Sequence, residues 1–253
     1  MLHADGIKMI LLIFCLLFGS LQADEGDFAF PQSAEFFNTS PHVLKEKLGI
    51  REISVNKEVC TIYLVNQGST DWTEISRLQG WNNIPLNEKG RNEAQKTGEL
   101  LLDQSVSAIY SSTLQQALET AHIIQDKLEN CPLYGDSRLK GEFHGKFEGY
   151  TKEQYVQESH FRFYDSLPPE KEIFFPCGEG GESKVDMACR MVPVIKEICA
   201  AHLGERIVIV THGGLFKLLN FYLGNYSEEE GTRSIPHGSI MVIQGDSQSL
   251  YLN

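Results

Sequence analysis

The sequence predicts an α/β fold, a three-layer sandwich whose mostly parallel central sheet carries helices on both faces. Two segments, residues 59–65 and 206–211, are near-continuous runs of β-prone apolar residues, as strands buried on both faces require. Segments with helical periodicity separate such runs along the chain. Strands that alternate with helices form βαβ units, which place the helices over the two faces of one open sheet.

The first half of the domain predicts two strands and two helices in alternation. Asn87 is a suitable N-cap for a helix running to about Leu102, because its side-chain oxygen can accept a backbone N–H of the first turn. The residues on the packed side of that helix are Ala94, Gly98 and Leu101. Residues 108–110 predict a second short strand, and residues 113–128 predict a second helix.

The second half predicts a long helix, a strand and the closing elements. Residues 183–202 show apolar residues at helical spacing, and Gly204 ends that helix. The apolar face comprises Val185, Ala188, Met191, Val192, Ile195 and Ile198. The strand over residues 206–211 runs directly into His212, and an apolar helix follows over residues 215–223. Two closing strands are predicted over residues 239–243 and 250–252.

The chain divides into three predicted parts. Residues 1–23 predict a signal peptide, because Lys8 precedes an apolar run too short to span a bilayer and Ala23 offers a cleavage point. The alternatives for this segment are a buried helix and an uncleaved anchor. Residues 24–58 form an N-terminal extension, and residues 59–253 form one domain. Cleavage near Ala23 predicts an exported protein, periplasmic or extracellular, with no stable membrane span.

Residues 151–178 break the alternation and predict an irregular insertion over one end of the sheet. Aromatic residues lie there among two prolines and many charges. These aromatic residues are Tyr155, Phe161, Phe163, Tyr164, Phe174 and Phe175. Two interpretations stay open for the insertion: a cap over a pocket, and packing against the N-terminal extension.

The charge balance limits the partners of the chain. Among 253 residues, 34 Asp and Glu face 22 Lys and Arg, which gives a net charge of -12. A surface this acidic repels nucleic acid and anionic membranes, so a nucleic-acid partner is excluded. An anion site must therefore be a local pocket.

Cysteine spacing predicts neither a metal site nor a redox motif. Loss of residues 1–23 removes Cys15 and leaves five cysteines, an odd number that guarantees at least one free thiol per chain. The sequence contains no CxxC and no HExxH pattern, so it predicts no zinc site and no cofactor.

Candidate functional residues follow from the strand positions. In parallel α/β sheets, ligands bind beyond the carboxyl ends of the strands. Three segments come directly after or at the ends of predicted strands: Asn66-Gln67-Gly68, Ser111-Ser112 and Thr211-His212-Gly213. We expect these segments to lie close together.

Six sequence blocks then point to one family. In chain order they are Asn66-Gln67-Gly68-Ser69-Thr70 with Trp72, Arg77-Leu78-Gln79-Gly80-Trp81 with Pro85-Leu86, Ser111-Ser112-Thr113-Leu114-Gln115-Gln116-Ala117-Leu118-Glu119-Thr120-Ala121, Gly145-Lys146-Phe147-Glu148-Gly149, Gly181-Glu182-Ser183 with Asp186 and Arg190, and Thr211-His212-Gly213-Gly214. In this order and spacing, the chain resembles the histidine phosphatase, or phosphoglycerate mutase-like, superfamily from about residue 61 to 243.

The resemblance also shows which catalytic residues have been replaced. In that family a histidine attacks phosphorus, while two arginines and a second histidine neutralise the phosphoryl oxygens. The resemblance places Gln67 at the nucleophile, Asn66 at the first arginine and Gln116 at the second. A glutamine amide is not a nucleophile, because its nitrogen lone pair is delocalised into the carbonyl.

Other positions of the resemblance are kept or shifted. The second histidine is present as His212, and an asparagine common late in the family is replaced by His237. The family's acid falls on Gly141, and Glu142 beside it would substitute only after a shift of the loop, so it is a weak candidate acid. The residues expected to contact a ligand are Asn66, Ser69, Arg77, Gln116, His212, Gly213 and His237.

Three functional hypotheses follow. The leading one is an exported pseudophosphatase that binds a phosphate-bearing ligand or a protein partner without turnover. The second is a divergent phosphomonoester hydrolase that uses His212 or His237 as its nucleophile. The third is a structural or partner-binding module whose interface is the aromatic segment over residues 151–178.

Overall fold

The computed structural model describes residues 59–129, 131–222, 235–246 and 250–252. The expected signal peptide and N-terminal extension lie outside these described residues and stay predictions. Among the described residues, no helix combines the length and the apolar character needed to cross a membrane.

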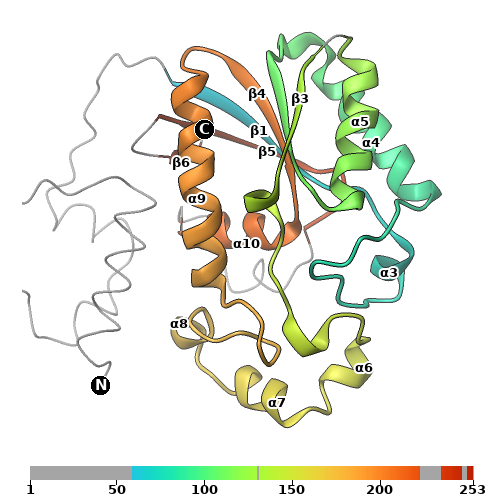
Figure 1. Ribbon diagram of the computed structural model, residues 1–253, viewed down its shortest axis with the longest axis vertical. Helices are drawn as coiled ribbons and strands as arrows, with labels where there is room; N and C mark the ends of the chain where they lie inside the picture. Colours follow the sequence, from blue (N-terminus) through green and yellow to red (C-terminus); the bar gives the residue numbers. More distant parts are fainter. Residues whose placement is uncertain (1–58, 130, 223–234, 247–249, 253) are drawn as a thin grey trace, which may run out of the picture.

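A six-stranded sheet in the order β3-β2-β4-β1-β5-β6 forms the centre of the structure (Figure 1). Its strands are β1 (Cys60–Asn66), β2 (Ala108–Ser112), β3 (Leu133–Asp136), β4 (Arg206–Thr211), β5 (Ile240–Gly245) and β6 (Leu250–Leu252). Strands β3, β2, β4 and β1 pair in parallel, whereas β5 is antiparallel to β1 and β6 is antiparallel to β5. The predicted mostly parallel sheet is confirmed.

Helices cover both faces of this sheet. The helices are α3 (Asp71–Glu74), α4 (Glu88–Leu101), α5 (Gln115–Lys127), α6 (Lys152–Tyr155), α7 (Ser159–Asp165), α8 (Pro169–Glu172), α9 (Lys184–Ala201) and α10 (Gly213–Tyr222). The described residues also contain the short 3₁₀ turns η2 (Leu102–Gln104), η3 (Ser137–Leu139) and η4 (Gly145–Phe147). Helices α4 and α5 lie on one face, and α9 and α10 lie on the other (Figure 1).

The two-residue period of the strands divides the apolar side chains between two cores. Ile62 and Leu64 of β1 pack with α9 and α10, whereas Tyr63 and Val65 pack with α4 and α5. The three-layer sandwich follows from this alternation, because each strand buries both of its faces.

Side-chain caps begin the two longest helices where the sequence predicts them. The Asn87 side chain accepts a hydrogen bond of 2.9 Å from the Gly90 N–H at the start of α4. Ser183 and Asp186 form a reciprocal capping box at the start of α9. These ends are predictable because both partners lie within four residues of each other.

Two structural details differ from the sequence predictions. Strand β3 was not predicted, because its four residues include Gly135, lie at the sheet edge and form no buried apolar run. Residues 151–178 are not irregular, since they contain α6, α7 and α8. Figure 1 shows these short helices together, at the end of the molecule toward which β1 and β4 run. Their aromatic rings pack on one another, as Tyr155 does on Phe161 at 4.8 Å between centroids.

Candidate functional site

The carboxyl ends of β1, β4 and β2 bring the central candidates together. Asn66 pairs with Thr211 in the parallel register of β1 and β4. The Gln67 N–H donates a 3.0 Å hydrogen bond to the Thr211 carbonyl, and His212 follows immediately. The segments after β1 and β4 therefore lie side by side, as the strand-end rule predicts.

Asn66 ties the segment before His237 to the sheet. Its side chain is almost fully buried, and its amide nitrogen donates to the carbonyls of Ile235 at 3.2 Å and Pro236 at 3.0 Å. Because two carbonyls fix the nitrogen, the orientation of the amide is determined, and Oδ1 has no hydrogen-bond partner within the described chain. The Asn66 amide thus stabilises the fold through its nitrogen, while its oxygen Oδ1 accepts no hydrogen bond from the described residues.

Gln67 is buried and orients His237 through its backbone. The side chain is 4% exposed, and its Oε1 has no partner among the described residues. The Gln67 carbonyl accepts a 2.9 Å hydrogen bond from Nδ1 of His237. A carbonyl can only accept, so Nδ1 of His237 carries a proton, and any neutral form of the ring has its lone pair on Nε2.

Gln116 links α5 to a loop rather than reaching an open pocket. The side chain is fully buried. Its Nε2 donates to the Asn82 carbonyl at 3.1 Å, and its Oε1 accepts from the Ile84 N–H at 3.3 Å. Both ends of this amide are therefore occupied by hydrogen bonds inside the protein.

His212 is a buried, neutral imidazole. Its Nε2 lies 2.8 Å from the hydroxyl oxygen of Ser112, and the residue is 8% exposed. Desolvation lowers the pKa of His212 from its ordinary 6.5 to about 3, and the charge of Arg190 and proximity of His237 act in the same direction. Near neutral pH, His212 therefore contributes a dipole and no positive charge.

This buried histidine should make stability depend on pH. The unfolded chain takes up a proton on His212 near pH 6.5, whereas the folded chain does so only near pH 3. Stability is therefore complete above pH 6.5 and is lost as the pH falls toward 3, at up to about 1.4 kcal/mol per pH unit. Urea unfolding at several pH values gives the free energy of unfolding as a function of pH. The slope of this curve should be smaller for His212→Gln than for the wild type, by the amount that corresponds to about one proton.

The matched control for this measurement is His122→Gln, which changes an exposed histidine on α5. Its slope should equal that of the wild type. Equal slopes for His212→Gln and the wild type would contradict a neutral, buried His212.

Three further candidates surround this centre. The N–H and hydroxyl of Ser69 donate to the Glu93 carboxylate at 2.8 and 3.0 Å. Arg77 lies over the Trp72 ring, with its guanidinium carbon 5.2 Å from the ring centroid. Gly213 begins α10 beside Asn66, because a Cβ at Gly213 would lie 3.7 Å from Asn66 Nδ2. The structure thus places Gly213 at the centre, while it ties Ser69 to α4 and Arg77 to an aromatic ring.

The loop after η3 closes over His212. A Cβ added at Gly141 would lie 2.9 Å from Cβ and Cγ of His212, so no larger side chain fits there without a backbone shift. Glu142 points its carboxylate toward His144 instead, with 3.8 Å between Oε1 and Nδ1. The expected weak acid therefore belongs to a neighbouring cluster that also contains Cys177.

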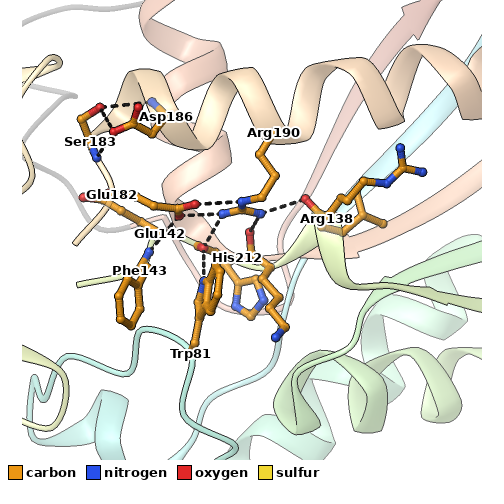
Figure 2. Close-up of polar contacts among 12 residues, drawn as sticks. Trp81, Arg138, Glu142, Phe143, Glu182, Ser183, Asp186, Arg190 and His212 are labelled. Atoms are coloured by element: carbon orange, nitrogen blue, oxygen red, sulfur yellow. Dashed lines mark hydrogen bonds and ion pairs between the residues drawn. The ribbon is translucent and has the colours of Figure 1, made fainter. Parts of the chain in front are cut away.

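Arg190 of α9 fixes this loop (Figure 2). Its Nε and Nη2 donate to the two carboxylate oxygens of Glu182 at 2.9 and 2.7 Å. The remaining donors reach the carbonyls of Arg138, Lys140 and Gly141 at 2.8 to 2.9 Å. All five guanidinium N–H groups are used, which holds the backbone of residues 138–141 in one place.

Sequence reasoning located Ser112 by its position alone and missed the role of Arg190. The strand-end rule placed Ser111-Ser112 near Thr211-His212-Gly213, and the structure adds that the Ser112 hydroxyl contacts Nε2 of His212. Arg190 belongs to a recognised block, but no local pattern reveals that it binds a loop about 50 residues away.

The side chains at these strand ends are mostly uncharged. The central side chains are two neutral amides, a neutral His212 and a His237 that the backbone orients. Arg190, whose charge helps to lower the pKa of His212, donates all five of its N–H groups to Glu182 and to loop carbonyls. Burial, with Glu142 nearby, raises the pKa of the Cys177 thiol to about 12, so Cys177 is not a thiolate nucleophile near neutral pH.

Comparisons with known proteins agree with this fold. A metal-independent phosphoserine phosphatase of Arabidopsis thaliana is 34% identical over 66% of this chain and 70% of its own length. A 2,3-bisphosphoglycerate-dependent phosphoglycerate mutase of Corynebacterium diphtheriae is 29% identical over 76% of this chain and 88% of its own. The solved structure of Bacillus stearothermophilus YhfR matches with a TM-score of 0.67 at 31% identity, covering 76% of this chain and 95% of that one.

The family model of the histidine phosphatase superfamily (branch 1) matches residues 62–252. This range includes every strand of the sheet, apart from the first two residues of β1, and all the candidate residues described above. The chain therefore belongs to the histidine phosphatase superfamily.

Proposed function

We propose that this protein is a pseudophosphatase, which binds a phosphate-bearing ligand at the remodelled strand ends and does not hydrolyse it. One observation carries this proposal. The positions of the nucleophile and of both clamping arginines hold Gln67, Asn66 and Gln116, and the amides of Asn66 and Gln116 are hydrogen-bonded within the fold.

The energetic argument concerns the missing charges. A hydrogen bond to a charged group contributes about 1.5–3 kcal/mol, so the absence of two such donors alone slows transfer by roughly 10²–10⁴-fold. Two described residues near this position do not compensate, since His212 is neutral and Arg190 is committed to Glu182 and three carbonyls. Catalysis requires interactions that are stronger in the transition state than in the bound ester, whereas ligand binding does not.

The unpartnered acceptors indicate what kind of ligand would fit. Asn66 Oδ1 and Gln67 Oε1 are buried without partners in the part of the chain that the structure describes. Buried acceptors are stabilised by donors, so the ligand should bring hydroxyl groups or the P–OH of a phosphomonoester monoanion. A hydroxylated phosphomonoester carries both groups.

A second candidate is a divergent phosphomonoester hydrolase with His237 as nucleophile. The observation that favours it is the hydrogen bond from His237 Nδ1 to the Gln67 carbonyl, which leaves Nε2 with a free lone pair. The phosphatase and mutase relatives are consistent with such chemistry. His212 is less suited, because its Nε2 is occupied by Ser112.

Phosphoenzyme trapping separates these two functions. We expect the purified protein to release no phosphate above the blank from aryl and sugar phosphomonoesters, and mass spectrometry should find no phosphorylated side chain. The same esters should raise the melting temperature, as a ligand bound only to the folded state does. The wild type, His237→Ala and His212→Ala should then be indistinguishable in turnover.

Hydrolysis that His237→Ala abolishes and His212→Ala spares would establish the second candidate. Absence of both turnover and thermal stabilisation would contradict ligand binding at this site.

A further inference from the structure

Three potential metal ligands converge beside the closed loop. Glu142, His144 and Cys177 each offer one ligand atom, and these atoms all lie within 4.8 Å of one another. Nδ1 of His144 lies 3.2 Å from Sγ of Cys177 and 3.8 Å from Oε1 of Glu142. Two of the ligands come from the loop between η3 and η4, and the third comes from the segment after α8.

Two of the three separations match one face of a tetrahedral metal site. Zinc binds sulfur at about 2.3 Å and nitrogen or oxygen at about 2.0–2.2 Å, so neighbouring ligand atoms lie about 3.3–3.6 Å apart. The separations of 3.2 and 3.8 Å from Nδ1 differ from these values by only a few tenths of an ångström. The third separation, between Cys177 and Glu142, lies within 4.8 Å, so a rotation of the Glu142 side chain would complete the face.

The backbone holds the three ligands in place independently of any ion. Phe143 lies between Glu142 and His144 in the chain, and two hydrogen bonds tie its backbone to Glu182. The Phe143 N–H donates to the Glu182 carboxylate at 3.1 Å, and the Phe143 carbonyl accepts from the Glu182 N–H at 2.7 Å. Gly178, next to Cys177, lies so close to the His144 carbonyl that a Cβ would stand 1.9 Å from that oxygen. A glycine at this position is what allows Cys177 to approach His144. The site is therefore preorganised.

Charge and burial also favour a divalent cation. The Glu142 and His144 side chains are 11% and 19% exposed, and within the described chain no hydrogen bond reaches the Glu142 carboxylate. A carboxylate and a thiolate together balance a charge of +2, while histidine binds as a neutral ligand. Lys184 is a positive charge near Cys177, but its Nζ forms an ion pair with the Glu172 carboxylate at 2.7 Å.

We propose that Glu142, His144 and Cys177 bind a zinc-class divalent cation and leave its fourth coordination position open to water or an anionic oxygen. A set of one sulfur, one nitrogen and one oxygen suits Zn²⁺ or Co²⁺ and disfavours Mg²⁺ and Ca²⁺, which take oxygen ligands. Binding breaks the S–H bond of Cys177 and releases its proton to solvent as the metal–sulfur bond forms. The inference does not depend on the proposed ligand-binding function.

Cobalt titration of the reduced, chelator-treated full chain tests the site. Co²⁺ should bind with one equivalent, produce a thiolate-to-cobalt charge-transfer band and be displaced by Zn²⁺. Cys177→Ser should lose that band and bind at least about 100-fold more weakly, because its thiolate ligand is gone. Cys189→Ser, which removes an exposed thiol of α9, is the matched control. It should keep the charge-transfer band and the Co²⁺ affinity of the wild type.

The other two ligands make the test independent of the folding of one variant. Glu142→Gln and His144→Asn should keep the charge-transfer band and weaken Co²⁺ binding at least about tenfold. Absence of the band in the wild type, persistence of the band in Cys177→Ser, or unchanged affinity in both other variants would each overturn the proposal.

Discussion

Replacing Arg190 by alanine is expected to lower the free energy of unfolding by about 3–5 kcal/mol, because it leaves a mostly buried charge without its partner. The Arg190 and Glu182 side chains are each 18% exposed and are joined by two hydrogen bonds. The substitution also removes the donors from three loop carbonyls, so the backbone that presses Gly141 against His212 loses its anchor. Urea unfolding measures the loss directly.

Arg138→Ala is the matched control for this experiment. Arg138 also forms two ion pairs, with Asp136 at 2.9 Å and Glu197 at 2.8 Å, but its side chain is 47% exposed. Exposed pairs contribute about 0–1 kcal/mol, so the loss should be several times smaller than for Arg190→Ala. Similar losses for the two variants would show that Arg190 is not the structural anchor of the loop.

The parts of this fold that the sequence predicts are those with local causes. The Asn87 cap lies three residues from its partner, and the β-prone run of β4 is recognisable without knowing its neighbours. Strand β3 escapes prediction because pairing with β2, and not its own composition, makes it a strand. The helices of residues 151–178 are short, and their aromatic packing, including Tyr155 on Phe147, arises only in three dimensions.

The candidate site divides in the same way. Strand ends and motif spacing lead to Asn66, Gln67 and His212, because a parallel sheet brings such residues to one edge. What the amides do there depends on partners far along the chain, such as the Pro236 carbonyl for Asn66. The cluster around Cys177 is invisible to metal motifs for the same reason, since 33 residues separate Cys177 from His144.

Restoring the family's charged residues should produce the largest change in chemistry. Gln67→His alone is expected to form phosphohistidine only very slowly, because little would neutralise the phosphoryl oxygens. Adding Asn66→Arg and Gln116→Arg supplies two charge-assisted clamps that together contribute roughly 3–6 kcal/mol. Phosphohistidine should then form from an activated aryl phosphomonoester about 10²–10⁴ times faster than in the single variant, as measured by mass spectrometry.

The control is the double variant Asn66→Arg with Gln116→Arg, which carries the same added charge but keeps Gln67. It should form no phosphohistidine. Both arginines displace amides that hold internal hydrogen bonds, so each is expected to reduce stability by about 1–3 kcal/mol, and folding is verified first by circular dichroism. A folded triple variant no faster than the single variant would contradict retention of the family's phosphate geometry.

The restored activity should stay limited to esters with good leaving groups. An alkyl leaving oxygen needs a proton from a general acid, and the family's acid position is Gly141. A glutamate there would place Cβ 2.9 Å from Cβ of His212, while Glu142 beside it faces His144 instead. The triple variant should therefore turn over aryl phosphates and leave alkyl phosphates near the blank. Equal rates on both would show that another residue supplies the proton, for which His237 beside Gln67 is a candidate.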